Sequence, residues 1–281
     1  MAAVWQGTLR KMRAVPGEGG LPAVYALADG FWNPAERAAD LSLAPYLDRE
    51  LYLEFGGKIA CVYCGRATKK TFGEGFCYPC FQARAEADVC IVKPELCHYH
   101  EPANPCRDDA FARSHCFQPH VLYAALTSGL KVGITRRANL PARWLDQGAT
   151  AAVPLAELPD RRAVGRLEAR LRDEEGVADR THWTRLLKQP EGDGDLGEFA
   201  GGVAALLAGW GVPLLSPEER TIRTFRYPVL RYPAKVTSFN LDKEPRVGGV
   251  LAGIKGQYLI FDGGVINLRK YAGYQVTVDA T

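Results

Sequence analysis

The sequence has almost no excess of charge of either sign. It carries 35 lysines and arginines against 32 aspartates and glutamates in 281 residues, a formal net charge of +3. This excess is too small to indicate nucleic-acid binding by itself, so such a prediction must rest on local basic patches. Because 47% of the residues are hydrophobic and 24% are charged, we expect a globular chain of two or three units.

The sequence also lacks a long apolar run. Its first residues, MAAVWQGTLRKMRA, do not contain the apolar stretch of a secretory signal. Residues 199–217 are uncharged, but glycines and a proline interrupt them, and their apolar part is shorter than the roughly 20 residues that cross a bilayer. We therefore expect a cytoplasmic protein without membrane contact. The uncharged segment is expected to form a buried helix, which starts at the capping-box pair Asp195 and Glu198.

Eight cysteines are present, and in a reducing compartment they indicate metal binding more than disulfides. The first set forms two CxxC pairs that are twelve residues apart: Cys61, Cys64, Cys77 and Cys80. Two such pairs can place four thiolates in a tetrahedron around one zinc ion. The alternatives are a redox dithiol or buried cysteines without a metal.

The second set of cysteines is less regularly spaced and consists of Cys90, Cys97, Cys106 and Cys116. This segment has little apolar content, so a second zinc ion is expected to hold it together. Histidines compete as ligands, namely His98, His100, His115 and His120, and the two sets could also share pairs in a cross-braced arrangement. Either arrangement predicts structural metals, because four thiolates leave no open coordination position.

A β-hairpin is expected at the centre of the chain. Residues 120–127 and 130–134 are apolar and rich in β-branched side chains, and Ser128 and Gly129 supply the turn between them. Side chains alternate across a strand, so Tyr123 and Lys131 can lie on one face of this hairpin.

A helix is expected after the hairpin, with Pro141 at its first helical position. Arg143 and Gln147 are four residues apart and therefore share a face of this helix. A phenol, an ammonium and a guanidinium would then converge.

Residues 149–158 predict a third strand, and residues 160–176 an amphipathic helix with Asp160 as its N-cap. Glu168 lies at the margin of the apolar face of that helix, where it can ligate a metal or pair with Arg172 on the surface. A further short helix is expected at 179–188, with Asp179 as its cap and with inward-facing Trp183, Leu186 and Leu187.

The central stretch resembles the GIY-YIG nuclease core. VLY at 121–123 stands where GIY would, and KVG at 131–133 stands where YIG would. Lys131 replaces the second Tyr of that pattern, and Gln147 stands where many members have His. The whole chain also resembles an uncharacterised bacterial family, a domain of unknown function that joins such a core to a Cys-rich segment and carries phrases close to CGRATKK, GLKVGITR, RWLDQGA and GIKGQYL.

The resemblance implies hydrolysis of a phosphodiester with one divalent ion. Glu168 would hold Mg²⁺ or Mn²⁺, and Tyr123 would orient or deprotonate the attacking water, with nearby cations favouring its ionised form. Lys131 and Arg143 would supply positive charge, and Arg143 would also bind the phosphate. The predicted catalytic residues are therefore Tyr123, Lys131, Arg143, Gln147 and Glu168.

Basic residues beside aromatic ones suit a nucleic-acid backbone with stacked bases, although they equally suit an ordinary solvated surface. They occur in the loop between the first CxxC pairs, at the end of the hairpin and after residue 217. The residues predicted to bind nucleic acid are Lys69, Lys70, Arg136, Arg137, Arg223 and Arg226.

The expected fold is α+β, with a small mixed GIY-YIG-like sheet and flanking helices after a Cys-rich segment and between β-rich ends. Its expected parts are residues 1–58, 59–118, 119–190, 191–215 and 216–281, and the last can pair with the first. Three functions remain open: a metal-dependent endonuclease on DNA or RNA, a non-cleaving zinc-containing nucleic-acid-binding protein, and a zinc-scaffolded enzyme or adaptor for another substrate.

Overall fold

The computed structural model describes residues 2–281 and divides into two compact units. One unit, here called the split unit, combines the residues up to Gln82 with Arg226–Thr281. The other, here called the inserted unit, is Ala83–Phe225. The two sets of cysteines therefore belong to different units, and the finer division of the chain into five parts remains a prediction.

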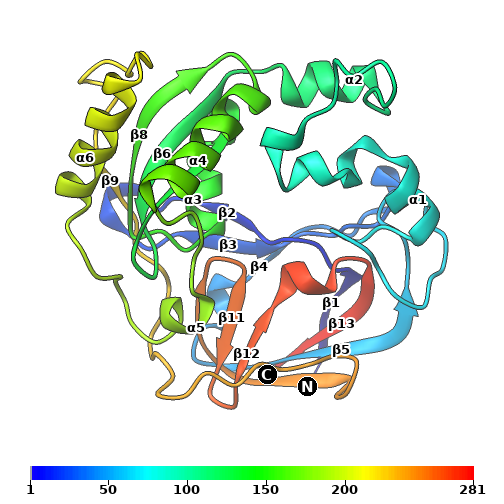
Figure 1. The fold of residues 1–281 in the computed structure, drawn as a ribbon. Helices are drawn as coiled ribbons and strands as arrows, with labels where there is room; N and C mark the ends of the chain where they lie inside the picture. Colours follow the sequence, from blue (N-terminus) through cyan, green and yellow to red (C-terminus); the bar gives the residue numbers. More distant parts are fainter. Residues whose placement is uncertain (1) are drawn as a thin grey trace. The chain divides into compact units, whose positions relative to one another are not determined.

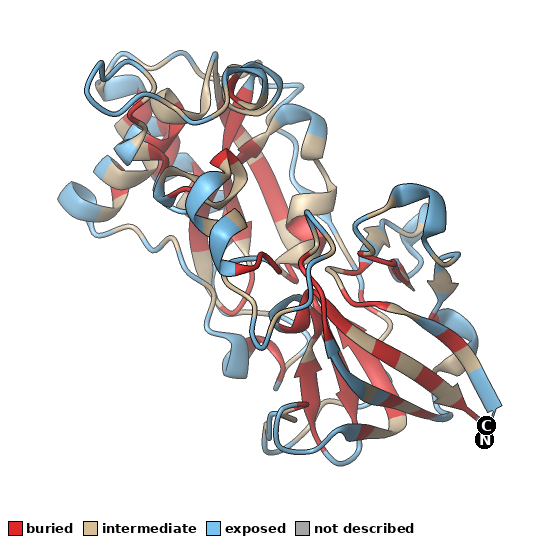
Figure 2. Cartoon of the chain, turned by 90° about the vertical axis from the view of Figure 1, so that its right-hand side faces the viewer, coloured by how far each residue is buried: buried red, intermediate tan, exposed pale blue. Residues whose placement is uncertain are grey.

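The main sheet of the split unit joins strands from both ends of the sequence (Figure 1). Within residues 2–281 it has six strands, all paired antiparallel. Their spatial order is β1 (Ala2–Thr8), β13 (Tyr274–Ala280), β5 (Glu50–Ile59), β10 (Arg246–Lys255), β11 (Tyr258–Phe261) and β12 (Val265–Asn267). Buried residues alternate with partly exposed ones along β13, so one face of this strand lies in the core (Figure 2).

A smaller sheet in the split unit contains β2 (Arg13–Val15), β3 (Val24–Leu27) and β4 (Leu41–Ser42). The helix α1 (Tyr78–Ala83) begins directly after Cys77 and contains Cys80. The KVTSFNL stretch at 235–241 is apolar and β-branched enough to suggest a strand, but it forms only one bridge, between Ser238 and Val265. The side chain of Asn240 instead accepts a hydrogen bond from the backbone N–H of Asp242, which turns the chain away from an extended path.

The sheet of the inserted unit has the spatial order β7 (Leu130–Arg136), β6 (His120–Leu126), β8 (Ala151–Leu158) and β9 (Arg223–Thr224). A mixed sheet was predicted, and this was wrong, because every strand pair in this sheet is antiparallel. The short turn between β6 and β7 allows no other direction, since a parallel pair needs a long crossover.

Helices cover both faces of this sheet. One face, which includes Leu122, Ala124 and Val132, packs against α4 (Arg161–Glu175) and α6 (Leu196–Gly209). The other face places Tyr123 and Ala125 against Trp144 of α3 (Ala142–Asp146). The order β6-β7-α3-β8-α4 thus runs strand, strand, helix, strand, helix along the chain.

The ends of the helices follow the predicted caps in most places. Asp160 accepts a hydrogen bond from the backbone of Ala163 at the start of α4, and Asp195 caps α6. Pro141 is the N-cap of α3 and not its first helical residue. The remaining helices of the inserted unit are short: α2 (Asp109–Phe111) and α5 (Trp183–Leu186).

The helix α5 differs from its prediction at both Asp179 and Trp183. His182 is the N-cap, because Asp179 lies 3.4 Å from Arg172 in an ion pair with α4. Trp183 is 40% exposed, whereas Leu186 and Leu187 are buried as predicted. Among the described residues, no helix has the length and apolar character needed to cross a membrane.

Candidate functional site

The first set of cysteines forms a compact four-thiol site in the split unit. The Sγ atoms of Cys61, Cys64, Cys77 and Cys80 all lie within 4.8 Å of one another, and Cys64 and Cys77 are 3.8 Å apart. Cys61 follows β5, and Cys80 lies in α1. The set can hold a zinc ion, in agreement with the prediction, since thiolates at this separation match a tetrahedral zinc site.

The electrostatics of this site favour a thiolate at Cys61. Burial raises the pKa of its thiol, but hydrogen bonds from the backbone of Cys77 and Cys64 outweigh burial and lower the pKa to about 7. A thiolate is the form that binds a metal. All eight cysteines of the chain are free thiols in the structure.

The second set of cysteines lines a pocket in the inserted unit. Of the four histidines predicted to compete as ligands, His98 is the one that lines this pocket within the described chain. His100 packs against Tyr99, and His115 stacks on Phe111 at 4.3 Å between ring centres. His120 lies in β6, where its Nδ1 is 2.6 Å from the carbonyl oxygen of Gln118.

The predicted catalytic residues form a third group, in the inserted unit, and Tyr123 lies at its centre. Its side chain is 0% exposed, and its hydroxyl donates a hydrogen bond of 2.7 Å to Oε1 of Gln147. Gly133 lies opposite in the β6–β7 register, where a Cβ atom would be 2.5 Å from the Tyr123 hydroxyl. The phenol therefore occupies space that only a glycine at 133 leaves open.

The pKa of Tyr123 is raised, because burial has a larger effect than the opposing charge of Arg143. We had expected nearby cations to favour the ionised phenol, and burial more than offsets them. The phenol is thus neutral at physiological pH and acts as a hydrogen-bond donor.

Lys131 lies on the same sheet face as Tyr123, since it pairs with Ala125. It is only 2% exposed, and burial followed by the charge of Arg143 lowers its pKa to about 8. The negative charges of Glu168 and Asp179 raise this pKa, but by less. An ammonium that titrates this close to neutral pH is a common feature of functional sites.

Arg143 extends from α3 toward the same place. It is half-buried, and its guanidinium charge lowers the pKa of the Tyr123 phenol. Its Nε is buried and has no hydrogen-bond partner among residues 2–281. A buried donor without a partner needs an explanation, and an anionic ligand would supply one.

Glu168 lies on α4 and is the last member of this group of predicted catalytic residues. Burial raises the pKa of its carboxyl, Lys131 lowers it, and Asp179 raises it again. Since β7 is the edge strand of the sheet, a side chain of α4 can act on Lys131 around this edge. Sequence analysis had treated Asp179 as a helix cap and missed its place beside Lys131 and Glu168; no motif marks it.

The predicted nucleic-acid-binding residues divide between the units. Lys69, Lys70 and Arg226 are exposed residues of the split unit, and Lys70 lies over the ring of Phe72 at 5.0 Å. The inserted unit contains Arg136, which is half-buried, and Arg223, which is exposed.

Arg137 is also exposed in the inserted unit, but it forms ion pairs with Glu157 at 2.7 Å and with Glu219 at 2.6 Å. These carboxylates already neutralise its charge, so Arg137 is less available to a phosphate than the other five residues.

Of the comparisons with known proteins, the one with protein families gives a match. No curated protein and no solved structure matches the chain. Residues 48–276 match the family described as "Protein of unknown function (DUF2797)", and because the match covers most of both units, the chain belongs to this family.

Proposed function

We propose that the inserted unit is a divergent GIY-YIG-like endonuclease that hydrolyses phosphodiesters of nucleic acid. One observation carries the proposal: Tyr123, Lys131, Arg143 and Glu168 come from four different elements, β6, β7, α3 and α4, and affect one another's ionisation. The order strand, strand, helix, strand, helix in this unit supports the proposal. A cytoplasmic location is part of this proposal.

The residues fit a divalent cation. Glu168 is a desolvated carboxylate with a raised pKa, and carboxylate oxygens are preferred ligands of Mg²⁺ and Mn²⁺. A bound ion would polarise the phosphoryl oxygen and stabilise the leaving oxygen.

The remaining residues would bind the phosphate and orient water. The unpaired Nε of Arg143 would donate to a phosphate oxygen, and Lys131 would add positive charge beside it. The Tyr123 hydroxyl, held by Gln147, would orient the attacking water by hydrogen bonding.

A second candidate is nucleic-acid binding without cleavage. It is favoured by the complete burial of Tyr123 and by the raised pKa of its phenol, which both oppose proton transfer to this residue. In that case Arg143 and Lys131 would bind phosphate, and no reaction would follow.

Labelled single- and double-stranded DNA and RNA oligonucleotides, incubated with Mg²⁺, Mn²⁺ or EDTA, test the proposal. We expect cleavage that requires a divalent ion and that Glu168→Gln abolishes. Tyr123→Phe should slow cleavage by about 100-fold or more. Glu175→Gln is the matched control, because Glu175 is an exposed carboxylate on the same helix, and it should cleave like the wild type.

Equal cleavage by wild type and Glu168→Gln would contradict the endonuclease. Binding without cleavage by the wild type would leave the second candidate, provided that affinity falls steeply with salt as phosphate contacts require. Affinity that is insensitive to salt would instead point to a substrate other than nucleic acid.

A further inference from the structure

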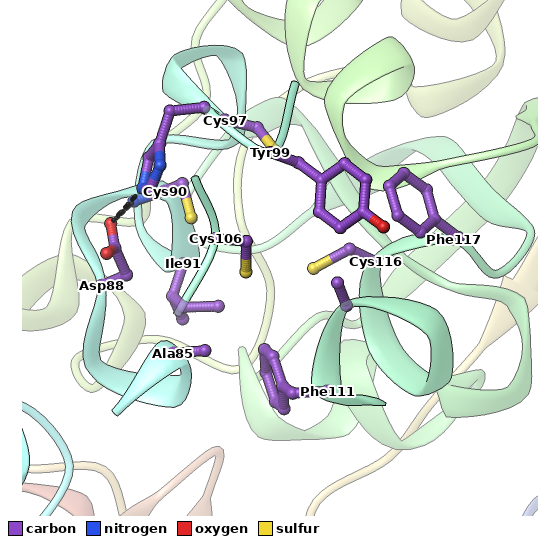
Figure 3. A pocket seen from close by; sticks show the side chains of 12 residues that line it. Ala85, Asp88, Cys90, Ile91, Cys97, Tyr99, Cys106, Phe111, Cys116 and Phe117 are labelled. Atoms are coloured by element: carbon purple, nitrogen blue, oxygen red, sulfur yellow. Dashed lines mark hydrogen bonds and ion pairs between the residues drawn. The ribbon is translucent and has the colours of Figure 1, made fainter. Parts of the chain in front are cut away.

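The second set of cysteines surrounds a single cavity in the inserted unit. Figure 3 shows their sulfur atoms turned toward one hollow from different short segments of the chain. Cys90 lies in a short helix, Val89–Ile91, and Cys97 caps the next one, Pro94–Leu96. Cys106 comes from a loop, and Cys116 ends the turn Ala112–Cys116. The cavity has a volume of about 20 Å³, more than the roughly 10–15 Å³ that one water molecule needs.

This arrangement is more open than a zinc site. Thiolates bound to one zinc ion at about 2.3 Å stand about 3.8 Å apart and leave no hollow between them. The first set meets this requirement. Within residues 2–281, the compact group that includes Cys90 joins it to Asp88 and His98 and to none of the other three cysteines of the second set.

Asp88 and His98 already form hydrogen bonds and ion pairs within the protein, beside the cavity. Nδ1 of His98 is 2.6 Å from the carbonyl oxygen of Asn104, and its Nε2 is 3.3 Å from Asp88. Asp88 also accepts a hydrogen bond from the backbone of Cys90 and pairs with Arg107 at 3.2 Å. Both ring nitrogens of His98 therefore have partners, and the four thiols are the donors left for a ligand.

Apart from Tyr99, the rest of the cavity wall is apolar. Ile91, Phe111 and Phe117 line it together with two alanines. A positive charge lies close by, because Arg161 of α4 donates a hydrogen bond to the carbonyl oxygen of Ile91. Four thiolates around a hollow with apolar walls and one neighbouring guanidinium suit a polynuclear, anionic group more than a single ion.

We propose that this cavity binds an iron–sulfur cluster through its four thiolates, Cys90, Cys97, Cys106 and Cys116. Four cysteines are the usual ligands of such clusters. Thiolates on a cluster stand farther apart than on one zinc ion, since they bind different iron atoms. Each thiol gives up its proton to solvent as its sulfur binds iron, and binding itself transfers no electron.

The test uses the full chain, produced in iron-supplied cells and purified without oxygen. We expect about two to four iron atoms and as many acid-labile sulfides per chain. A visible absorption band that dithionite bleaches should accompany them, together with about one zinc ion at the first set. Two zinc ions per chain without iron and sulfide would overturn the proposal, and so would an absence of metal at the second set.

Two variants assign the cluster to its ligands. Cys106→Ser should lose iron and sulfide and keep the zinc ion, whereas Cys64→Ser, the matched control in the first set, should lose zinc and keep iron and sulfide. Iron and sulfide that survive in Cys106→Ser would overturn the assignment. If Cys106→Ser does not fold, the iron and sulfide content of the wild type still decides the proposal.

Discussion

Lys131 carries an ammonium group into the interior of the inserted unit, and this has an energetic cost. Its pKa of about 8, against an ordinary value of 10.5, corresponds to a penalty on the order of 3 kcal/mol for the charged form. The folded state therefore releases the proton at lower pH than the unfolded state does. A buried cation at this cost is explained best by a role in binding or chemistry.

Replacing Lys131 by Met should therefore stabilise the fold. We expect Lys131→Met to raise the free energy of unfolding by about 1–3 kcal/mol at pH 7, as measured by urea denaturation. The penalty on the wild type is fully present below pH 8 and disappears as pH rises to 10.5, so the gain should shrink across this range. Lys188→Met, at an exposed position, should change stability little. A gain that is absent at pH 7, or that grows with pH, would contradict the penalty.

Sequence alone could predict part of this group of residues. Alternation along a strand placed Tyr123 and Lys131 on one face, and the observed register agrees. The burial of Lys131 and the position of Asp179 could not be predicted, because both depend on how the segment after α4 returns to the edge of β7. A backbone hydrogen bond of 2.8 Å from Val132 to Ala178 makes this contact.

At the level of elements, α4 links the second set of cysteines to the proposed phosphate site. Its residue Gly165 packs against Pro94, which lies between Cys90 and Cys97, and a Cβ atom at 165 would be 2.5 Å from the Cβ of Pro94. Glu168 follows one turn later on the same helix. Displacement of α4 from the cysteine segment should thus affect both sites.

Gly165→Ala should lower the free energy of unfolding by about 1–3 kcal/mol, because the added methyl group overpacks this contact. Gly201→Ala is the control. Gly201 is also inside a helix, but it is exposed and a Cβ there would meet nothing within 4 Å, so this change should stabilise by about 0.5–1 kcal/mol. Thermal or urea unfolding measures both, and the same sign for the two variants would contradict the packing argument.

The starts of helices could be predicted better than the contacts that the helices and strands make in the tertiary structure. The caps Asp160 and Asp195 mark local backbone geometry, and both were correct. Asp179 carries the same local signal, but Arg172 of the preceding helix α4 pairs with it, and α5 starts later. The mixed sheet was wrong because the direction in which β8 pairs with β6 depends on contacts between residues far apart in the chain.

At the level of the whole molecule, the inserted unit interrupts the sequence of the split unit. The sequence indicated that the C-terminal strands could pair with the N-terminal ones, and β13 does lie between β1 and β5. It did not show that a boundary falls between the two sets of cysteines, since the Cys-rich composition continues across residue 82.

A fragment of residues 83–225 should fold by itself, because this unit has its own sheet and apolar core. We expect a single cooperative thermal transition by circular dichroism. A fragment of residues 83–190 is the control: it lacks α6, whose Leu196, Val203 and Leu207 are part of that core, and it should not fold stably. Non-cooperative melting of the longer fragment would show that the unit depends on the rest of the chain.

The place of β13 in the sheet also bears on the order in which the protein is made. A ribosome finishes residues 83–225 well before it reaches residues 274–280, which separate β1 from β5. During that interval the inserted unit can reach its native state and bind its ligand, whereas β1 and β5 still lack the strand that pairs with both of them. The main sheet of the split unit is therefore completed only after the whole inserted unit has been made, and chaperones would meet the chain at that stage.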